Sequence, residues 1–340
     1  MKKNSQIKVI VAGKYFAASY DYLKSALPEI SLEMVEFRDF IKKAEKAHII
    51  IPAMVKVDKG IFKKASCLRL VQQWGAGLDG VDITAARVHR VAVANVPTVG
   101  SGNAESVAEW YVMAALALSR KTCEIRSQVS KGHPWGTPLG QALYGRTAGL
   151  IGFGGIGKAL AIRLRSFQMK IIAIKRHPDK MTAQDLGVEW IGGMKDLPQL
   201  LKRADYLFLC VPLNSETRNM IHERELSLLP KGAFILNAAR GPIINKNALM
   251  KALDSGHLRG AALDVYWEEP PEPKDPILNY SNVLATPHIA GVTDVSYQGI
   301  AAKVAENIRR VMSGKLPIYC ANPALKAGWL KNKKIFRNPV

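Results

Sequence analysis

Three polar residues stand where apolar runs end in the second half of the chain, a fourth lies on a nearby loop, and their types suit acid–base chemistry. Arg240 follows "AFILNAA", Asp264 ends "GAALD", and His288 follows "NVLATP". Glu269 lies a few residues after Asp264, in the proline-rich segment "YWEEPPEP". If the apolar runs are parallel strands, these side chains converge, because ligands of such sheets bind outside the carboxyl ends of the strands.

The chemistry that this set favours is hydride transfer at a carbon that bears an oxygen. His288 is the natural proton donor or acceptor because imidazole titrates near neutral pH, and Glu269 is expected to favour its charged form. Arg240 can bind a substrate carboxylate with two donors and polarise the adjacent carbonyl. Each residue alone also has a structural alternative. His288 could be a core histidine, Arg240 a partner in a surface ion pair, and Glu269 a solvated loop carboxylate.

A glycine pattern precedes this set in the chain. The segment "GLIGFGGIGKALAIRL" contains Gly152, Gly154 and Gly157 as GxGxxG, directly after an apolar run and directly before a helical pattern. Such glycines allow a tight turn and close approach of the backbone to a pyrophosphate, which the helix N-terminus stabilises. The pattern predicts a dinucleotide site, with a purely structural turn as the alternative.

The strand expected after this turn ends in basic residues. The segment "MKIIAIKRHPDK" has Lys175, Arg176 and His177 where NAD enzymes carry an acidic residue that binds the ribose and repels a 2′-phosphate. We therefore expect Lys175 and Arg176 to bind the 2′-phosphate of NADP(H), with NAD(H) as the alternative cofactor. Asp179 is expected to cap a turn. For the three basic residues, the structural alternative is a solvated strand end without a ligand.

Short apolar runs alternate with helix-compatible segments over most of the chain, which is typical of α/β proteins with parallel sheets. In the second region the runs are almost continuously apolar, as expected of strands buried on both faces. A helical segment over 102–132 should connect the two regions, and a last helix is expected over 295–315. Strands are expected at 7–12, 32–37, 47–53, 68–77 and 91–97, and then at 147–154, 170–176, 204–212, 232–241, 259–266 and 281–288.

Composition bounds the possibilities. A chain of 340 residues is long enough for about two domains. Hydrophobic residues make up 48% and charged residues 22%, which excludes a largely disordered chain. No apolar run approaches the ~20 residues of a membrane span. The cysteines are scattered without a CxxC pair, so we expect no metal site and a reducing cytoplasm.

The formal net charge of +20 would suit a polyanionic partner or anionic substrates. The charges are spread along the chain, and the one dense cluster is the tail "KAGWLKNKKIFRNPV", where Trp329 and Phe336 alternate with lysines. We expect a solvated terminal extension there, rather than a contact with nucleic acid or membrane.

The motifs together resemble those of the D-isomer-specific 2-hydroxyacid dehydrogenases. The matching segments are "WGAGLDGVD", "GNAESVAEW", "GLIGFGGIGKALA", "LLPKGAFILNAARG", "GAALDVYWEEPPEP" and "VLATPHIAGVT", which occur in the family's order. The resemblance implies two doubly wound parallel-sheet domains, with a Rossmann-type cofactor domain (104–289) inserted into a discontinuous flavodoxin-like substrate domain (1–103 and 290–340). It also implies a homodimer formed largely through the region of the connecting helix.

The resemblance further assigns residues to roles. It implies Arg240, Glu269 and His288 as the catalytic set, and the backbone amides of Ala76 and Gly77 as the site for a substrate carboxylate. Besides the three glycines, Lys175 and Arg176, it implies a cofactor site that includes Gly155, Ile156, Val211, Pro212, Thr217, Ala238, Arg240 and Asp264. A turn at Val211–Pro212 and a capping role for Asp264 remain structural alternatives.

The substrate is expected to be a small 2-oxo acid, as in NADPH-dependent glyoxylate and hydroxypyruvate reductases. Phosphoglycerate dehydrogenase is the alternative, but such enzymes would place an arginine near "IPAMVKVD", where this chain has Pro52 and Ala53 and only Lys56 could substitute. Formate dehydrogenases would have glutamine in place of Glu269. A dinucleotide-sensing corepressor-like scaffold is the alternative from another class, because such proteins can retain the catalytic residues.

Overall fold

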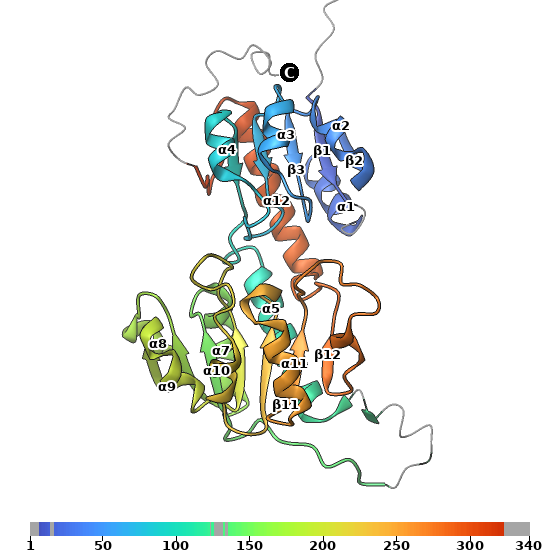
Figure 1. Ribbon diagram of the computed structural model, residues 1–340. Helices are drawn as coiled ribbons and strands as arrows, with labels where there is room; N and C mark the ends of the chain where they lie inside the picture. Colours follow the sequence, from blue (N-terminus) through green and yellow to red (C-terminus); the bar gives the residue numbers. More distant parts are fainter. Residues whose placement is uncertain (1–6, 14–16, 123, 126–131, 133–134, 323–340) are drawn as a thin grey trace, which may run out of the picture. The chain divides into compact units, whose positions relative to one another are not determined.

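A computed structural model describes residues 7–13, 17–122, 124–125, 132 and 135–322 (Figure 1), and these form two units. Unit 1 comprises Met1–Asn103 and Asp294–Val340, and unit 2 comprises Ala104–Thr293. Cys123 and the basic tail with Trp329 and Phe336 lie outside the described residues. Each unit contains one parallel sheet with helices on both faces, so the predicted fold class is confirmed.

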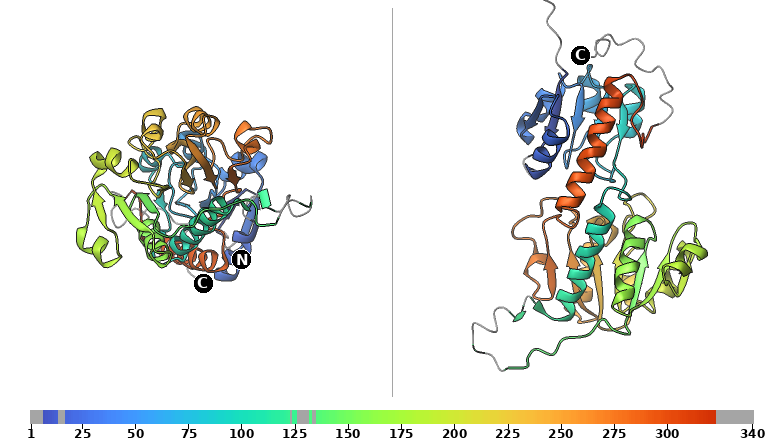
Figure 2. Two further views of the ribbon diagram at one scale, coloured as in Figure 1. Left: turned by 90° about the horizontal axis from the view of Figure 1, so that it is seen from below. Right: turned by 180° about the vertical axis from the view of Figure 1, so that it is seen from behind.

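The sheet of unit 1 has the strand order β2-β1-β3-β4-β5, which is the flavodoxin-like order. Its strands are β1 (Val9–Ala12), β2 (Leu32–Val35), β3 (Ile49–Ile51), β4 (Leu70–Gln72) and β5 (Ala92–Ala94). Helices α1 (Ala17–Ala26) and α12 (Asp294–Met312) cover one face, and Figure 2 shows α12 running along it. The other face is covered by α2 (Phe40–Ala44), α3 (Lys59–Lys64) and α4 (Ile83–Val88).

Burial on both faces explains the continuous apolar runs of these strands. In β1, Val9 and Val11 belong to the cluster beneath α1 and α12, whereas Ile10 and Ala12 belong to the cluster beneath α2, α3 and α4. Aspartates fix the helix starts on that second face: Asp58 accepts from the amide of Ile61 at 3.1 Å, and Asp82 caps α4 in the same way.

The sheet of unit 2 has the order β12-β11-β10-β9-β6-β7-β8. Strands β7 and β8 are added on one side of β6 and strands β9 to β12 on the other, so the strand order reverses between β6 and β9, as in Rossmann folds. Its strands are β6 (Thr147–Ile151), β7 (Lys170–Ile174), β8 (Trp190–Gly192), β9 (Tyr206–Leu209), β10 (Ala233–Asn237), β11 (Leu258–Leu263) and β12 (Val283–Ala285). One face packs against α5 (Asn103–Ser119), α7 (Gly155–Ser166) and α8 (Lys180–Asp185), and the other against α9 (Leu197–Leu201), α10 (Glu223–Ser227) and α11 (Lys246–Asp254). Short 3₁₀ turns complete the description: Phe37–Asp39, Met194–Asp196, Gly241–Ile243 and Pro276–Asn279.

Two details differ from the expectations. Strand β8 was not predicted, because it is a three-residue edge strand and only Gly192 in it is buried. The helix expected over 102–132 ends at Ser119, and Lys121 just beyond it has a φ of 54°, a left-handed conformation that commonly follows the end of a helix.

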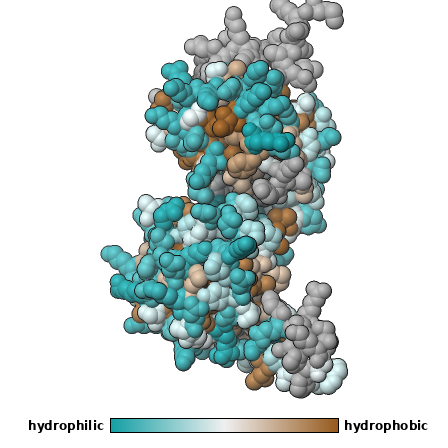
Figure 3. Space-filling view, turned by 45° about the vertical axis from the view of Figure 1, so that its right-hand side comes forward, coloured by the Kyte–Doolittle hydropathy of each residue, from teal (hydrophilic) through white to brown (hydrophobic). Residues whose placement is uncertain are grey.

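One face of the described surface is mainly polar (Figure 3). Figure 3 shows that on this face hydrophilic residues dominate over each unit, with smaller hydrophobic areas among the hydrophilic ones. None of the helices in the described ranges combines the length and the apolar composition that crossing a membrane would need.

Replacing Ile308 by Ala should destabilise unit 1 by about 2–5 kcal/mol, the usual cost of removing a buried Ile side chain. Ile308 is 0% exposed, on the face of α12 that packs on the sheet. Ile41 in α2 is 53% exposed, so Ile41→Ala is the matched control and should change the free energy of unfolding little. Denaturant unfolding of both variants checks this; equal losses would contradict the assigned packing of α12.

Candidate active site

The glycine turn connects β6 to α7. Gly152 has a φ of 103°, and a β-carbon there would lie 2.5 Å from the carbonyl oxygen of Cys210, so only glycine fits. A β-carbon at Gly157 would lie 2.2 Å from the carbonyl oxygen of Gly152, whereas nothing lies within 4 Å of one at Gly154. The open space at Gly154, the N-cap of α7, fits a pyrophosphate, because the first amides of α7, from Gly155 and Ile156 onward, have no partner within the helix.

The end of β7 carries the three basic residues in exposed or half-buried positions. Arg176 forms an ion pair with Glu216, with 2.7 Å between Nη2 and Oε2 and with both side chains more than half exposed. Asp179 caps α8, where its carboxylate accepts from the amide and hydroxyl of Thr182. These hydrogen bonds from Thr182 lower the pKa of Asp179. The capping role expected for Asp179 is therefore observed, and the ion pair with Glu216 was not foreseen.

The loop after β9 contains Val211, Pro212 and Thr217. The hydroxyl of Thr217 donates to the carbonyl of Pro212 at 2.7 Å and accepts from the amide of Asn214 at 2.9 Å. Thr217 is 5% exposed, so its side chain orders the loop from inside. The proposed role of this loop in lining a cofactor depends on the shape that these hydrogen bonds give it.

The loop after β10 brings Ala238 and Arg240 to the same edge of the sheet. Asn237, which is 0% exposed, donates from its amide nitrogen to the carbonyl of Arg240 and accepts from the amide of Ala239. The guanidinium of Arg240 donates to the carbonyl of Ala239 at 2.7 Å. From α5, the hydroxyl of Tyr111 accepts from the amide of Ala238 at 2.9 Å and donates to the carbonyl of Leu209.

The carboxylate of Asp264, directly after β11, is bound inside the protein. It is 1% exposed and accepts from the hydroxyl of Thr286 and from the amides of Ile289 and Ala290. Burial raises the pKa of Asp264, and these three hydrogen bonds only partly offset that effect. Asp264 was expected to line the cofactor, with capping or ion pairing as the alternative; its carboxylate binds a hydroxyl and two loop amides, and its contact with a cofactor stays a prediction.

Glu269 and His288 form a close pair at this edge. The Oε2 atom of Glu269 lies 2.7 Å from Nδ1 of His288, and its Oε1 atom accepts from the amide of Tyr266 at 3.0 Å. Burial alone would raise the pKa of Glu269, but the hydrogen bond and charge of His288, the Tyr266 amide and the charge of Arg240 together lower it. A carboxylate held in this way orients the imidazole and stabilises its positive form.

Ala76 and Gly77 lie in unit 1, in the loop after β4. The amide of Val96 donates to the carbonyl of Gly75 at 3.0 Å, and the side chain of Asn95 donates to the carbonyl of Ala76 at 2.8 Å. Within the described ranges the amides of Ala76 and Gly77 themselves donate to no protein acceptor. Both amides are therefore available to an anion.

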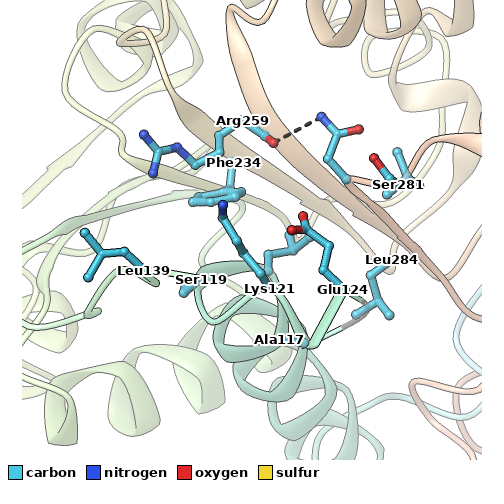
Figure 4. Close-up of a pocket in the computed structure, with 12 residues that line it drawn as sticks. Ala117, Ser119, Lys121, Glu124, Leu139, Phe234, Arg259, Ser281 and Leu284 are labelled. Carbon is cyan, nitrogen blue, oxygen red and sulfur yellow. Dashed lines mark hydrogen bonds between the residues drawn. The ribbon is translucent and has the colours of Figure 1, made fainter. Parts of the chain in front are cut away.

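A pocket of about 50 Å³ lies elsewhere in unit 2, at the amino ends of β10, β11 and β12 (Figure 4). Its lining includes Lys121, Glu124, Phe234 and Arg259, and the carbonyl of Arg259 accepts from the side chain of Asn282 at 3.1 Å. Since Arg240, Asp264 and His288 all follow the carboxyl ends of strands, this pocket is separate from them. In the part of the chain that the structure describes, no group of three or more His, Cys, Asp or Glu side chains could hold a metal ion.

Three residues that support the site were missed by the sequence analysis. Tyr111 and Trp110 looked like ordinary core aromatics of a helix, although Trp110 is the last residue of the motif "GNAESVAEW" and Tyr111 directly follows it. Thr286 was only part of the quoted segment "VLATPH". The polar atoms of these side chains were the signal that could have identified them. Buried Tyr, Trp and Thr side chains need hydrogen-bond partners, and such partners are often found at a site.

Comparisons with known proteins agree with this geometry. A family model described as "D-isomer specific 2-hydroxyacid dehydrogenase, NAD binding domain" matches residues 112–290. The chain is 35% identical over 300 residues to D-3-phosphoglycerate dehydrogenase of Methanocaldococcus jannaschii, covering 86% of this chain and 56% of that protein. It therefore spans little more than half the length of that relative.

Two further likenesses extend over most of the chain. Glyoxylate reductase of Thermococcus litoralis is 36% identical over 271 residues, covering 77% of this chain and 79% of that enzyme. A solved structure from Thermus thermophilus has a TM-score of 0.80 and 29% identity, and covers 93% of this chain and 100% of its own. With the glycine turn and the Glu269–His288 pair in place, these matches lead to one conclusion: the chain belongs to the family of D-isomer-specific 2-hydroxyacid dehydrogenases.

Proposed function

We propose that the protein transfers a hydride between NADP(H) and a small 2-oxo or D-2-hydroxy acid, and that it reduces glyoxylate or hydroxypyruvate. The observation that carries the proposal is the 2.7 Å contact between Glu269 and His288, at the sheet edge that also holds the glycine turn and Arg240. The similarity to a glyoxylate reductase over 77% of the chain supports the small acid. Oxidation of NADPH or NADH by a panel of 2-oxo acids is the direct test.

The residues divide the chemistry among them. A bound nicotinamide supplies or accepts the hydride. His288, held at Nδ1 by Glu269, gives a proton from Nε2 to the carbonyl oxygen as that oxygen becomes a hydroxyl. Arg240 binds the carboxylate of the substrate and polarises its carbonyl. The role proposed for the amides of Ala76 and Gly77, in unit 1, is to bind a substrate carboxylate. In the reverse direction neutral His288 accepts the proton of the hydroxy acid.

The units are proposed to have separate roles. Unit 2 would bind the cofactor through Gly152, Gly154, Gly157 and the first amides of α7, with the loops after β9 and β10 beside it, and unit 1 would be the substrate domain. We further propose a homodimer that forms through the region of α5, and a cytoplasmic location.

The preference for NADP(H) is proposed from the end of β7. Arg176 would bind the 2′-phosphate with help from Lys175, in place of the carboxylate that binds the ribose of NAD. The ion pair of Arg176 with Glu216 opposes this, but exposed pairs contribute only ~0–1 kcal/mol. A hydrogen bond from arginine to a charged phosphate contributes roughly 1.5–3 kcal/mol, so the phosphate should displace Glu216.

The first prediction concerns the pair. Glu269→Gln should move the alkaline limb of the pH profile for reduction to lower pH, because reduction needs protonated His288 and the neutral amide no longer stabilises its charge. Burial alone would raise the pKa of Glu269, but its contacts, led by the hydrogen bond with His288, lower it, so Glu269 is ionised in the neutral range. In the wild type this stabilisation is therefore present at neutral pH and is lost as the pH falls through the pKa of Glu269. Profiles of kcat/KM against pH measure the shift.

Two further variants serve as a control and as a direct test of His288. Glu268→Gln changes the neighbouring exposed carboxylate and should leave the limb in place. His288→Ala should lower kcat by about 10²–10⁴ while NADPH still binds. An unmoved limb in Glu269→Gln, or full turnover in His288→Ala, would rule out the assigned roles.

The second prediction concerns the cofactor. The wild type should prefer NADPH to NADH by about 10- to 150-fold in kcat/KM, the ratio that corresponds to 1.5–3 kcal/mol. Arg176→Ala should lose most of that preference, and Glu216→Gln should strengthen it by freeing the guanidinium. Arg224→Ala, at another exposed arginine of unit 2, should change nothing. A wild type that prefers NADH, or an unchanged preference in Arg176→Ala, would refute this proposal.

The third prediction separates the substrates. Glyoxylate or hydroxypyruvate should have a higher kcat/KM than phosphohydroxypyruvate, because Pro52 and Ala53 stand where an arginine for the phosphate would be expected. If the phosphorylated substrate is preferred by about tenfold, a difference of ~1.4 kcal/mol, the alternative of a phosphoglycerate dehydrogenase holds. Lys56→Ala should then abolish the preference, while Lys63→Ala, at an exposed lysine of α3, should not.

A further inference from the structure

The backbone of His288 has an unusual conformation. Its φ is 56°, in the left-handed region that non-glycine residues seldom adopt because it strains the backbone. The surrounding structure must therefore hold this residue in place. The conformation matters because it directs the side chain so that Nδ1 meets Oε2 of Glu269.

Asp264 supplies the contacts that hold the backbone of this segment. Its carbonyl accepts from the amide of His288 at 2.9 Å. Its Oδ1 and Oδ2 atoms accept from the amides of Ile289 and Ala290, each at 2.8 Å. One residue thus binds three successive amides, starting with that of the proposed proton donor.

The carboxylate of Asp264 is in turn oriented by two side chains. The hydroxyl of Thr286 lies 2.6 Å from Oδ1, and the indole nitrogen of Trp110 lies 3.1 Å from that hydroxyl. An indole N–H can only donate, so Thr286 accepts from Trp110 and its own hydrogen is directed to Asp264. Trp110 is 6% exposed and belongs to α5, which packs on the sheet and is a rigid support.

We propose that Trp110 and Thr286 are positioning residues, which act through Asp264 to fix the backbone of His288 so that its imidazole faces Glu269. The role given to His288 rests on the proposed function. The chain of hydrogen bonds does not touch the reacting atoms, and its effect is geometric. A displacement of about 1 Å of a catalytic group can cost ~10²-fold in rate.

Thr286→Val tests this most directly, because it keeps the shape of the side chain and removes the hydroxyl. In the protein without cofactor, the amides of His288, Ile289 and Ala290 should exchange with deuterium about 5- to 30-fold faster, as expected for a local loss of hydrogen bonding. The kcat for glyoxylate should fall by about 10- to 100-fold, with the Kd of NADPH unchanged. Thr286→Ser should restore both quantities.

Two other variants keep the test decisive. Trp110→Phe removes only the N–H and should change exchange and kcat in the same direction by a smaller factor. Ser119→Ala removes another buried hydroxyl of α5, which bonds to Tyr206 at 2.8 Å, and should lower stability without affecting residues 288–290. It is the matched control for a general loss of stability.

Unchanged exchange of these amides in Thr286→Val would overturn the proposal, as would a serine variant as impaired as the valine one. If the wild type reduces no 2-oxo acid, the proposed function fails, yet the exchange measurement still decides whether Thr286 and Trp110 hold the segment.

Discussion

The common carboxyl edge of the seven-stranded parallel sheet is the constraint on which the rest of unit 2 depends. Because every strand pair in this sheet is parallel, the loops after β6, β7, β9, β10, β11 and β12 all begin on one side. Gly152, Arg240, Asp264 and His288 are far apart in the sequence and become neighbours of this edge for that reason alone. Burial of the strands on both faces fixes the arrangement, since any slip of register would expose part of two hydrophobic clusters.

Two carboxyl groups at this edge, buried Asp264 and half-buried Glu269, show how neighbours decide a pKa. Desolvation is the largest effect on both and raises the pKa of each. For Glu269 the net shift is downward, because His288 and Arg240 add positive charge to the hydrogen bonds. Asp264 is more deeply buried, so although hydrogen bonds from a hydroxyl and two amides and the charge of His288 lower its pKa, the net shift is upward. The contrast suits separate roles: Glu269 places a negative charge beside His288, whereas Asp264 holds the backbone of residues 288–290 through hydrogen bonds.

Much of this arrangement follows from the sequence, because it depends on strong local patterns. Continuous apolar runs located the buried strands, GxGxxG located the turn, and strand ends located Arg240, Asp264 and His288. What escaped prediction depends on contacts between distant segments. Strand β8 is a short, partly exposed edge; Trp110 and Tyr111 have the spacing of ordinary core residues; and Glu216 reaches Arg176 from another loop without any local signal.

Burial separates the residues of the site that tolerate substitution from those that do not. Thr286, Asp264 and Trp110 share one chain of hydrogen bonds inside the protein, so a change in any of them leaves a buried polar group without its partner. Arg176 and Glu216 are exposed and packed against little, so their substitution carries almost no cost in stability. If the 2′-phosphate is bound there, as proposed, cofactor preference depends on a balance of exposed charges that one substitution can reverse. The Glu269–His288 pair, by contrast, lies beside a segment whose hydrogen bonds lead through Asp264 and Thr286 to Trp110 of α5.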